Sequence, residues 1–358
     1  MTATSSELSD ASRPDSTTER PSRGRLLVAG LGVALPVVLL VSSAVGPVGV
    51  PVGTTARILW AHLLPGEHVA DWTAAQDQIV WAFRMPRTLL AALVGASLAL
   101  AGMVLQAVIR NPLADPYVLG ASSGASMGAV GALVAGATVP SLLVSGSAFG
   151  GAAAAAALVF VLAQRAGQVA PLRLVLVGVA LSYLFSAATS WITVTADHGK
   201  LPGLVFFLLG SVSSATWAML AIPLVVLLAA LTHAALRVDH LNAVMTGDES
   251  ATSLGVDVSR FRIEALVATS LLTGAVVAVS GGIGFVGMVV PHVCRLVVGA
   301  DHRRLVPATV LGGAVFLVVV DMIARTAAAP QELPIGIVTS ALGAPFFLWL
   351  LRGHRRRR

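Results

Sequence analysis

The chain has 358 residues, of which 56% are hydrophobic and 11% charged, and these proportions exclude an ordinary soluble globular protein. Its mean hydropathy of +0.87 predicts an integral membrane protein. The formal charge of +6 does not indicate nucleic-acid binding, because the arginines stand at the chain ends and in short loops between apolar runs. As the only cysteine, Cys294 excludes an internal disulfide and a thiolate metal site.

In chain order, residues 1–25 are rich in Ser, Thr, Arg and Asp, so we expect a disordered cytoplasmic tail. The next run, Leu26 to about Val45, is too long for the apolar core of a secretory signal and lacks a clear cleavage site, which favours an uncleaved first helix. Hydropathy predicts an all-α membrane domain over residues 26–351, followed by a basic cytoplasmic tail, 352–358. Its ten expected spans are 26–45, 88–108, 118–138, 141–163, 172–194, 215–236, 264–281, 283–298, 306–324 and 334–351.

Positive charge sets the expected orientation. Arginines precede the first span, and Arg352 and Arg355–Arg358 follow the last, so both termini are expected in the cytoplasm and the number of spans is expected to be even. Only Gly281-Gly282 separates the seventh and eighth spans, and one merged helix there would give nine. The charge pattern therefore favours ten spans of a multi-pass cell-membrane protein.

Arginines also stand at the expected outer ends of two spans. Arg84 and Arg87 bracket Pro86 at the mouth of the second span, and Arg325 follows Asp321 by four residues in the ninth. One interpretation is interfacial arginines that snorkel to the membrane surface, with an Asp321–Arg325 pair one turn apart. The other is a cationic rim that captures carboxylates of a soluble partner.

Within the spans, small residues allow helix backbones to approach closely, and a few polar residues or prolines interrupt the apolar runs. The candidate packing and pathway residues are Gly95, Gly102, Gln106, Asn111, Pro112, Gly284, Pro291 and His292.

The longest polar interruption is Asp239–Arg262, and it carries helix punctuation. Thr246 to Glu249 has the form of a capping box, and Gly255 is a natural stop one short helix later. Asp257 is expected to cap a second short helix ending at Arg262. Connectors between spans are usually short, so a docking element is favoured over a mere connector. Its candidate residues are Asp248, Glu249, Ser250, Ser253, Leu254, Gly255 and Arg260.

Several enzymatic motifs do not occur in the sequence. The only Gly-Lys pair, Gly199-Lys200, precedes Leu201, so the chain has no phosphate-binding loop and is not expected to hydrolyse ATP. His292 has no second ligand at helical spacing, and no metal site is expected. The spans are nearly free of ionisable residues, which argues against a proton- or sodium-driven carrier. The energy for any transport must then come from another subunit.

Many ordered motifs from about residue 26 to 351 resemble the FecCD group, the permeases of ATP-binding-cassette (ABC) importers for iron chelates and cobalamin. They are Arg84-Met-Pro-Arg87, Gly95, Gly102, Gln106, Asn111-Pro-Leu-Ala114, Pro116, Leu119-Gly120, Gly124-Ala125, Gly284-Phe-Val-Gly287, Pro291-His292, Arg295-Leu296, Asp301-His-Arg303, Glu332-Leu-Pro-Ile-Gly336 and Gly343-Ala-Pro345.

The resemblance implies a type II ABC importer permease of ten helices that works as a homodimer or heterodimer around a central path by alternating access. Its implied partners are two cytoplasmic ATPase subunits, which hold the ATP and Mg, and an extracytoplasmic binding protein; no cofactor is expected on this chain. The resemblance assigns Asp239–Arg262 to ATPase coupling and Arg84, Arg87 and Arg325 to binding-protein docking. It places a gate near Gln168–Leu172, although that segment departs from the polar residues of some members.

The cargo and the class of function keep alternatives. An iron–siderophore complex is the first expectation, with cobalamin or haem behind it, and no residue discriminates among them. A non-transporting membrane scaffold or sensor is the alternative from another class, and a lone secondary carrier is a further one.

Overall fold

The computed structural model describes residues 20–64, 66, 71–137, 142–165, 168–169, 171–197, 199 and 201–355. Residues 1–19 of the expected N-terminal tail lie outside the described residues, and α1 (Arg20–Ala44) begins at Arg20, within the expected tail. At the other end, α15 (Ile335–Arg355) continues into the expected basic tail. The two helices therefore extend into the predicted tails 1–25 and 352–358, because arginine is a good helix former and a helix need not end at the membrane surface.

Seven helices among the described residues are long and apolar enough to cross a bilayer. Three shorter apolar helices, α5 (Ala121–Val134), α13 (Val286–Val298) and α15, bring the total to the ten expected spans. The long ones are α1, the joined α3 (Ala74–Asp77), η1 (Gln78–Arg84) and α4 (Met85–Ile109), then α6 (Leu142–Ala163), α7 (Pro171–Val194), η4 (Trp217–Leu220) with α9 (Ala221–Leu236), α12 (Val258–Ser280) and α14 (His302–Thr326).

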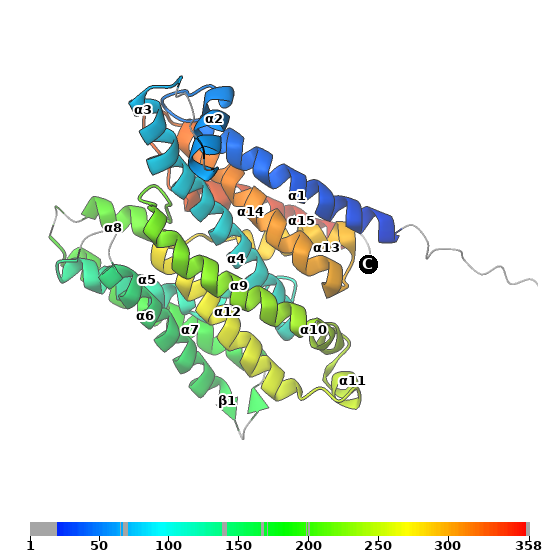
Figure 1. Cartoon of the computed structure of the whole chain (residues 1–358). Coiled ribbons are helices and arrows are strands. Elements are labelled where there is room, and N and C mark those ends of the chain that lie inside the picture. The colour runs from blue at the N-terminus through cyan, green and yellow to red at the C-terminus, as the bar shows by residue number, and fades with distance from the viewer. Residues whose placement is uncertain are drawn as a thin grey trace, which may run out of the picture.

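Short elements join the spans. Two antiparallel strands of two residues each, β1 (Gln164–Arg165) and β2 (Gln168–Val169), lie between α6 and α7. The remaining short helices are α2 (Val52–Leu63), η2 (Pro116–Leu119), α8 (Leu201–Leu208), α10 (Val238–Met245) and α11 (Asp248–Ser253). The expected all-α architecture is confirmed, and Figure 1 shows the spans packed side by side, with α2 and α3 at one end and α10 and α11 at the other.

The seventh and eighth spans are separate, as the charge pattern predicted. α12 ends at Gly281, which has φ +64°, and residues 281–285 are not helical before α13 begins. A Cβ at Gly281 would stand 1.8 Å from the Phe207 carbonyl oxygen. Only glycine therefore fits this turn, both in backbone conformation and in space.

α4 forms the centre of the bundle. In its most apolar window 89% of the residues are buried, against 11% for α1, so neighbouring helices surround α4 whereas α1 lies at the periphery. Gly95 of α4 meets the backbone of Gly313 in α14, and Gly102 meets that of Gly287 in α13. A Cβ at Gly102 would lie 1.9 Å from the Gly287 carbonyl oxygen. These glycines let the backbones touch, as close packing in lipid requires.

Three non-helical segments cross near the α2–α3 end: residues 209–216, 281–285 and 332–334. Backbone hydrogen bonds connect the 209–216 segment to helix ends that adjoin the other two segments. The Ser211 N–H donates to the carbonyl of Ser280 at the end of α12 (2.8 Å), and the Ile335 N–H at the start of α15 donates to the carbonyl of Gly210 (2.9 Å). Irregular backbone at membrane depth requires such internal partners. The crossing joins the start of α15 to the segment between α8 and α9.

Candidate functional site

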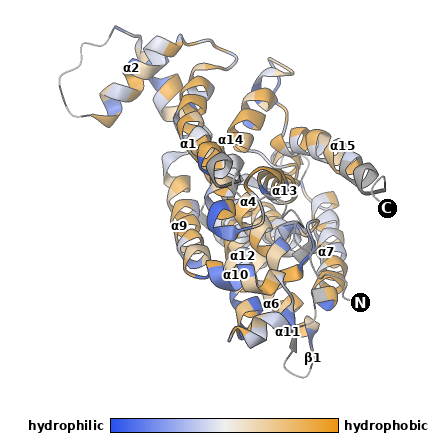
Figure 2. Ribbon diagram, turned by 90° about the vertical axis from the view of Figure 1, so that its right-hand side faces the viewer, coloured by the Kyte–Doolittle hydropathy of each residue, from blue (hydrophilic) through white to orange (hydrophobic). Residues whose placement is uncertain are grey.

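The short helices α10 and α11 form a polar unit that projects from one end of the bundle (Figure 1). Figure 2 shows hydrophilic residues gathered at α10, in contrast to the apolar spans behind it. We call residues 238–257 the α10–α11 unit. It occupies most of the interruption that the sequence assigned to docking.

Gly255 ends α11 as predicted. It has φ +82°, and the N–H groups of Gly255 and Val256 donate to Thr252 O (2.9 Å) and Ala251 O (3.0 Å). This pair of bonds is a Schellman motif, which satisfies the last carbonyls of a helix. The helix therefore stops in a fixed geometry and leaves Leu254 at its tip, with 70% of the residue exposed.

The predicted capping box at Thr246 is wrong. Gly247, with φ +122°, is the N-cap of α11 and no side chain caps it. The Thr246 hydroxyl instead donates to Ala243 O at 2.8 Å, because Thr246 belongs to the end of α10. Sequence reasoning missed α10, although Leu241 and Val244, both buried, stand three residues apart as an apolar helix face requires.

Asp257 is an N-cap, but not of a short helix. Its carboxylate accepts from the Arg260 N–H at 3.0 Å, and the helix that follows is α12, which runs to Ser280. The expected second short helix is therefore the first part of the seventh span. Its polar residues belong to a helix that continues into the bundle.

One carboxylate fastens the α10–α11 unit to two spans. Asp248 Oδ1 lies 3.1 Å from Arg110 Nη2 and 2.8 Å from Arg262 Nη2. Arg110 terminates α4 in the left-handed conformation, with φ +53°, and the Arg262 side chain is only 7% exposed on α12. The start of α11 is thus joined directly to the central helix. The exposed side of α11 is formed by Glu249, Ser250, Ser253 and Leu254.

Further polar contacts join α10 to α14 and α12. The Asn242 Oδ1 accepts from the His302 N–H (3.0 Å), and its amide donates to Asp301 (3.0 Å). Burial alone would raise the pKa of Asp301, but hydrogen bonds from the Arg303 N–H and Asn242, with the charges of Arg303 and Arg304, lower it below its ordinary value. Glu264 of α12 contacts both Arg237 (3.0 Å) and Arg260 (3.2 Å). The unit is braced on three spans.

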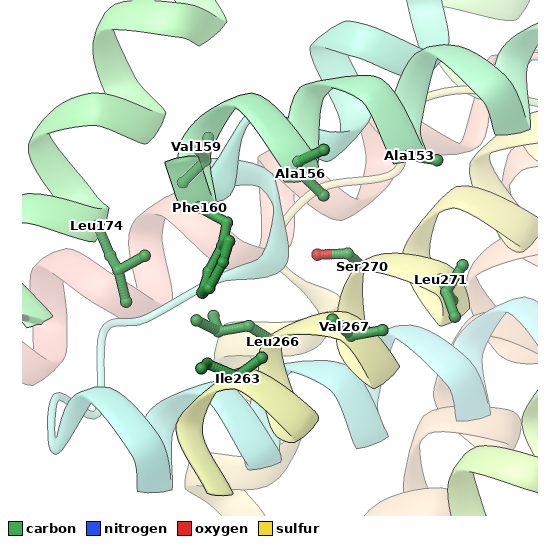
Figure 3. Close-up of a pocket in the computed structure, with 11 residues that line it drawn as sticks. Ala153, Ala156, Val159, Phe160, Leu174, Ile263, Leu266, Val267, Ser270 and Leu271 are labelled. Carbon is green, nitrogen blue, oxygen red and sulfur yellow. The ribbon is translucent and has the colours of Figure 1, made fainter. Parts of the chain in front are cut away.

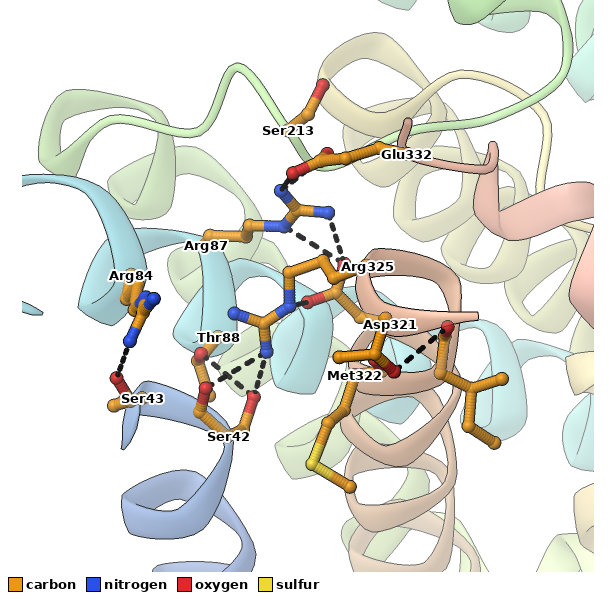
Figure 4. A network of polar contacts seen from close by, with 12 residues as sticks. Ser42, Ser43, Arg84, Arg87, Thr88, Ser213, Asp321, Met322, Arg325 and Glu332 are labelled. Atoms are coloured by element: carbon orange, nitrogen blue, oxygen red, sulfur yellow. Dashed lines mark hydrogen bonds and ion pairs between the residues drawn. The ribbon is translucent and has the colours of Figure 1, made fainter. Parts of the chain in front are cut away.

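At the opposite end, Arg84, Arg87 and Arg325 are buried. Figure 4 shows their side chains turned toward acceptors of the same chain. Arg84 donates to the carbonyls of Ser43, Ala44 and Val48, and Arg325 donates to the Ser42 carbonyl at 3.0 Å.

Arg87 and Arg325 share the carboxylate of Asp321. Arg87 Nε donates to Asp321 Oδ1 at 3.0 Å, and its Nη1 lies 2.8 Å from Glu332 Oε2. The expected Asp321–Arg325 pair is present at 3.2 Å, as a charge contact whose alignment does not give a hydrogen bond. These three guanidinium groups already bind acceptors of their own chain. Their role in binding-protein docking therefore stays a prediction, and it requires acceptors of the binding protein to replace some of these internal ones.

The candidate packing residues occupy different environments. Gln106 donates to the carbonyls of Gly287 (3.1 Å) and Met288 (3.3 Å) and accepts from Arg295 (3.1 Å), which ties α4 to α13. In the turn after α4, the Asn111 side chain accepts a hydrogen bond from the Leu113 N–H, and Pro112 is exposed. Gly284 has open space where a Cβ would stand. In α13, Pro291 is buried, and the His292 ring lies edge-on to Phe346 with the ring centroids 6.2 Å apart.

Sequence reasoning missed Tyr117. Its hydroxyl accepts from the Ile283 N–H, 166 residues away, in the non-helical segment between α12 and α13. No local pattern marks such a contact. The expected gate at Gln168–Leu172 coincides with β2 and the start of α7, and Ala170 within it lies outside the described residues.

A cavity of about 330 Å³ between α6, α7 and α12 is almost wholly apolar. Figure 3 shows Phe160, Leu266 and Val267 facing it, with the Ser270 hydroxyl the only polar side chain of its lining. Such a lining lacks the convergent polar groups of a ligand site. No group of three His, Cys, Asp or Glu residues among those described is placed to hold a metal ion.

The profile of the FecCD transport family matches residues 34–353. The chain belongs to the FecCD transport family. It is 39% identical to the cobalamin import system permease protein BtuC of Halobacterium salinarum, over 95% of this chain and 99% of that protein. It is 40% identical to the hemin transport system permease protein HmuU of Yersinia pestis, over 80% of this chain and 88% of that protein.

The fold of this FecCD protein also has a solved counterpart. A structure described as an inward-facing, metal-chelate type ABC transporter aligns with a TM-score of 0.79 and 32% identity, covering 92% of this chain and 99% of that one. The FecCD protein is thus a multi-pass permease subunit of an ABC importer. Such a permease works with a separate ATPase subunit, which hydrolyses the ATP, and with a binding protein.

Proposed function

We propose that this FecCD permease imports a metal chelate, foremost an iron–siderophore complex, by alternating access. Support comes from relatives whose names specify Fe(3+) dicitrate, hemin and cobalamin, each of them a metal held by organic ligands. Cobalamin and haem are therefore the second candidates. A chelate fits this chain better than a bare ion, because an ion would need convergent charged ligands and no group of three His, Cys, Asp or Glu residues among those described is placed to supply them.

The α10–α11 end is proposed to face the cytoplasm. This end carries Arg110, Arg237, Arg260, Arg262, Arg303 and Arg304, against Arg57, Arg84, Arg87 and Arg325 at the other end. An excess of arginine in the short loops marks the cytoplasmic side. The α10–α11 unit then faces the cytoplasm, as docking of an ATPase requires, and both termini are proposed to lie on the same side of the cell membrane.

The α10–α11 unit is proposed to couple the ATPase to the bundle. The observation that carries this proposal is the contact of Asp248 with Arg110 and Arg262, since a displacement of α11 is passed to α4 and α12 through it. Leu254 is exposed at the tip of α11, where an ATPase partner docked on the α10–α11 unit would contact it. Movement of the central helix changes which end of the pathway is open.

Binding-protein docking is proposed at the α2–α3 end by exchange of carboxylates. Glu332 is 30% exposed, whereas the Arg87 side chain to which it is paired is 9% exposed. An acidic residue of the binding protein that replaces Glu332 would gain a charge-assisted bond to Arg87. The same exchange frees the 332–334 segment, which adjoins the start of α15.

The coupling proposal is tested by Leu254→Glu in proteoliposomes that contain the permease, its ATPase and its binding protein. The change adds charge at an exposed position, so folding is preserved, and we expect uptake to fall at least tenfold. Ala300→Glu, on an exposed loop at the same end, is the matched control and should transport normally. Full uptake by Leu254→Glu would refute the coupling role.

The cargo and the scaffold alternative have their own test. The ligand retained by the cognate binding protein identifies the chelate, and an iron–siderophore is expected. A membrane scaffold would co-purify with partners but would not move the cargo when ATP is supplied. ATP-dependent uptake excludes that alternative.

A further inference from the structure

A basic cavity lies between α1 and α14 at the α10–α11 end. Its volume is about 440 Å³, and Arg25 of α1 and Arg303 and Arg304 of α14 line it. The apolar part of its lining, here called the floor, is formed by Val28, Ala29 and Pro307. The transport mechanism described above uses none of these residues.

The charge of this cavity matches a single anion. Arg303 contacts Asp239 at 2.9 Å, and the N-cap Asp301 lies beside Arg303 and Arg304. Three arginines and two carboxylates leave a net charge of +1. A phosphodiester carries one negative charge, so one such group neutralises the cavity.

The neighbourhood of the cavity is suited to acyl chains. α1 is the least buried of the seven long spans. Leu26, Ala29, Val33 and Val37 are exposed along it at spacings of three and four residues, and this forms one apolar helix face. Ala29 belongs both to this face and to the cavity floor, so the apolar face continues into the charged site.

We propose that this cavity binds the headgroup of an anionic phospholipid of the cytoplasmic leaflet, with the acyl chains lying along α1. The proposal rests on the orientation given under the proposed function. Basic pockets between membrane helices on the cytoplasmic side are suited to such headgroups. The guanidinium group of arginine donates two hydrogen bonds at once to two oxygens of a phosphate. Because two of the arginines belong to α14 and one to α1, the headgroup would be bound between these two helices.

The occupant is a lipid and not free phosphate, because apolar Val28, Ala29 and Pro307 line the cavity together with the arginines. A soluble phosphate would gain only the contacts with arginine and would leave the apolar floor exposed to water. A bound lipid would also join the peripheral α1 to α14 at the end where α10 is anchored. The site therefore links the surrounding membrane to the region next to the α10–α11 unit.

The test measures lipid retention by the purified full-length permease in detergent, using native mass spectrometry with added phosphatidylglycerol or phosphatidylcholine. We expect phosphatidylglycerol to bind at least tenfold more tightly than phosphatidylcholine. Arg304→Gln should weaken phosphatidylglycerol binding roughly fivefold, the effect expected for one arginine near a charged surface, and Arg25→Gln/Arg304→Gln should weaken it further. Arg304→Lys, which keeps the charge, should retain most of the affinity.

Arg173→Gln is the matched control, because it removes one partly buried arginine at the start of α7, outside the cavity. It should leave lipid binding unchanged. Equal retention of the two lipids, or equal effects of Arg304→Gln and Arg173→Gln, would overturn the proposal. So would displacement of the lipid by millimolar inorganic phosphate or glycerol 3-phosphate. Because both lipids reach the protein from detergent solution, failure here is distinct from a wrong orientation or a failure of transport.

Discussion

Replacing Asp321 with Ala tests whether the buried arginines hold the α2–α3 end together. Asp321 is fully buried and contacts both Arg87 and Arg325. After the replacement Arg87 keeps Glu332, but Arg325, 2% exposed, loses its carboxylate partner among the described residues. Breaking a buried ion pair by removal of one partner costs about 3–5 kcal/mol, so we expect a loss of stability of that size.

The assay is the thermal unfolding midpoint of the purified permease in detergent. At about 2–4 °C per kcal/mol, Asp321→Ala should lower the midpoint by roughly 10 °C. Asp321→Ala/Arg325→Met removes the unpaired charge as well and should recover more than half of the loss. A shift below about 3 °C for Asp321→Ala, or a double variant as unstable as the single one, would refute the structural role of this network.

Three further changes test other parts of the structure. Gly102→Ala puts a Cβ against the Gly287 carbonyl and should cost about 1–3 kcal/mol of stability. In the control Gly131→Ala, no atom lies within 4 Å of the new Cβ, so this change should be neutral or stabilise by about 0.5–1 kcal/mol. Equal thermal unfolding midpoints for the two variants would contradict the close packing of α4 against α13. Glu332→Gln removes the internal competitor for Arg87, so binding-protein affinity measured by surface plasmon resonance should rise a few-fold, and unchanged affinity would exclude the exchange. A reporter enzyme that works only outside the cell should be active when fused in the α7–α8 loop, and one that works only in the cytoplasm should be active when fused after Met245. The reverse pattern would refute the orientation.

The spans were predictable because each is a local property. An apolar run of membrane length gives a helix whatever lies around it, and Gly281-Gly282 marked the one ambiguous boundary correctly. The Gly255 stop was predictable for the same reason, since a left-handed residue after a helix favours glycine. Helix content and the number of spans therefore follow from hydropathy, glycine and the distribution of arginine.

The environment of the arginines was not predictable from the sequence alone. Arg87 is 234 residues from Asp321 and 245 from Glu332, so only the packing of α4 against α14 and against the segment before α15 brings these charges together. The capping box failed for a related reason, because a preceding helix, α10, took the Thr246 hydroxyl first. Long-range contacts and competing neighbours decide such sites, and neither leaves a local pattern.

This FecCD permease depends for its energy on a separate ATPase subunit. The most direct measurement is the accumulation of radiolabelled chelate in proteoliposomes with the permease alone and with its ATPase and binding protein added. We predict accumulation against a gradient only when the ATPase, hydrolysable ATP and binding protein are all present. Concentrative uptake by the permease alone would show that it does not need the ATPase.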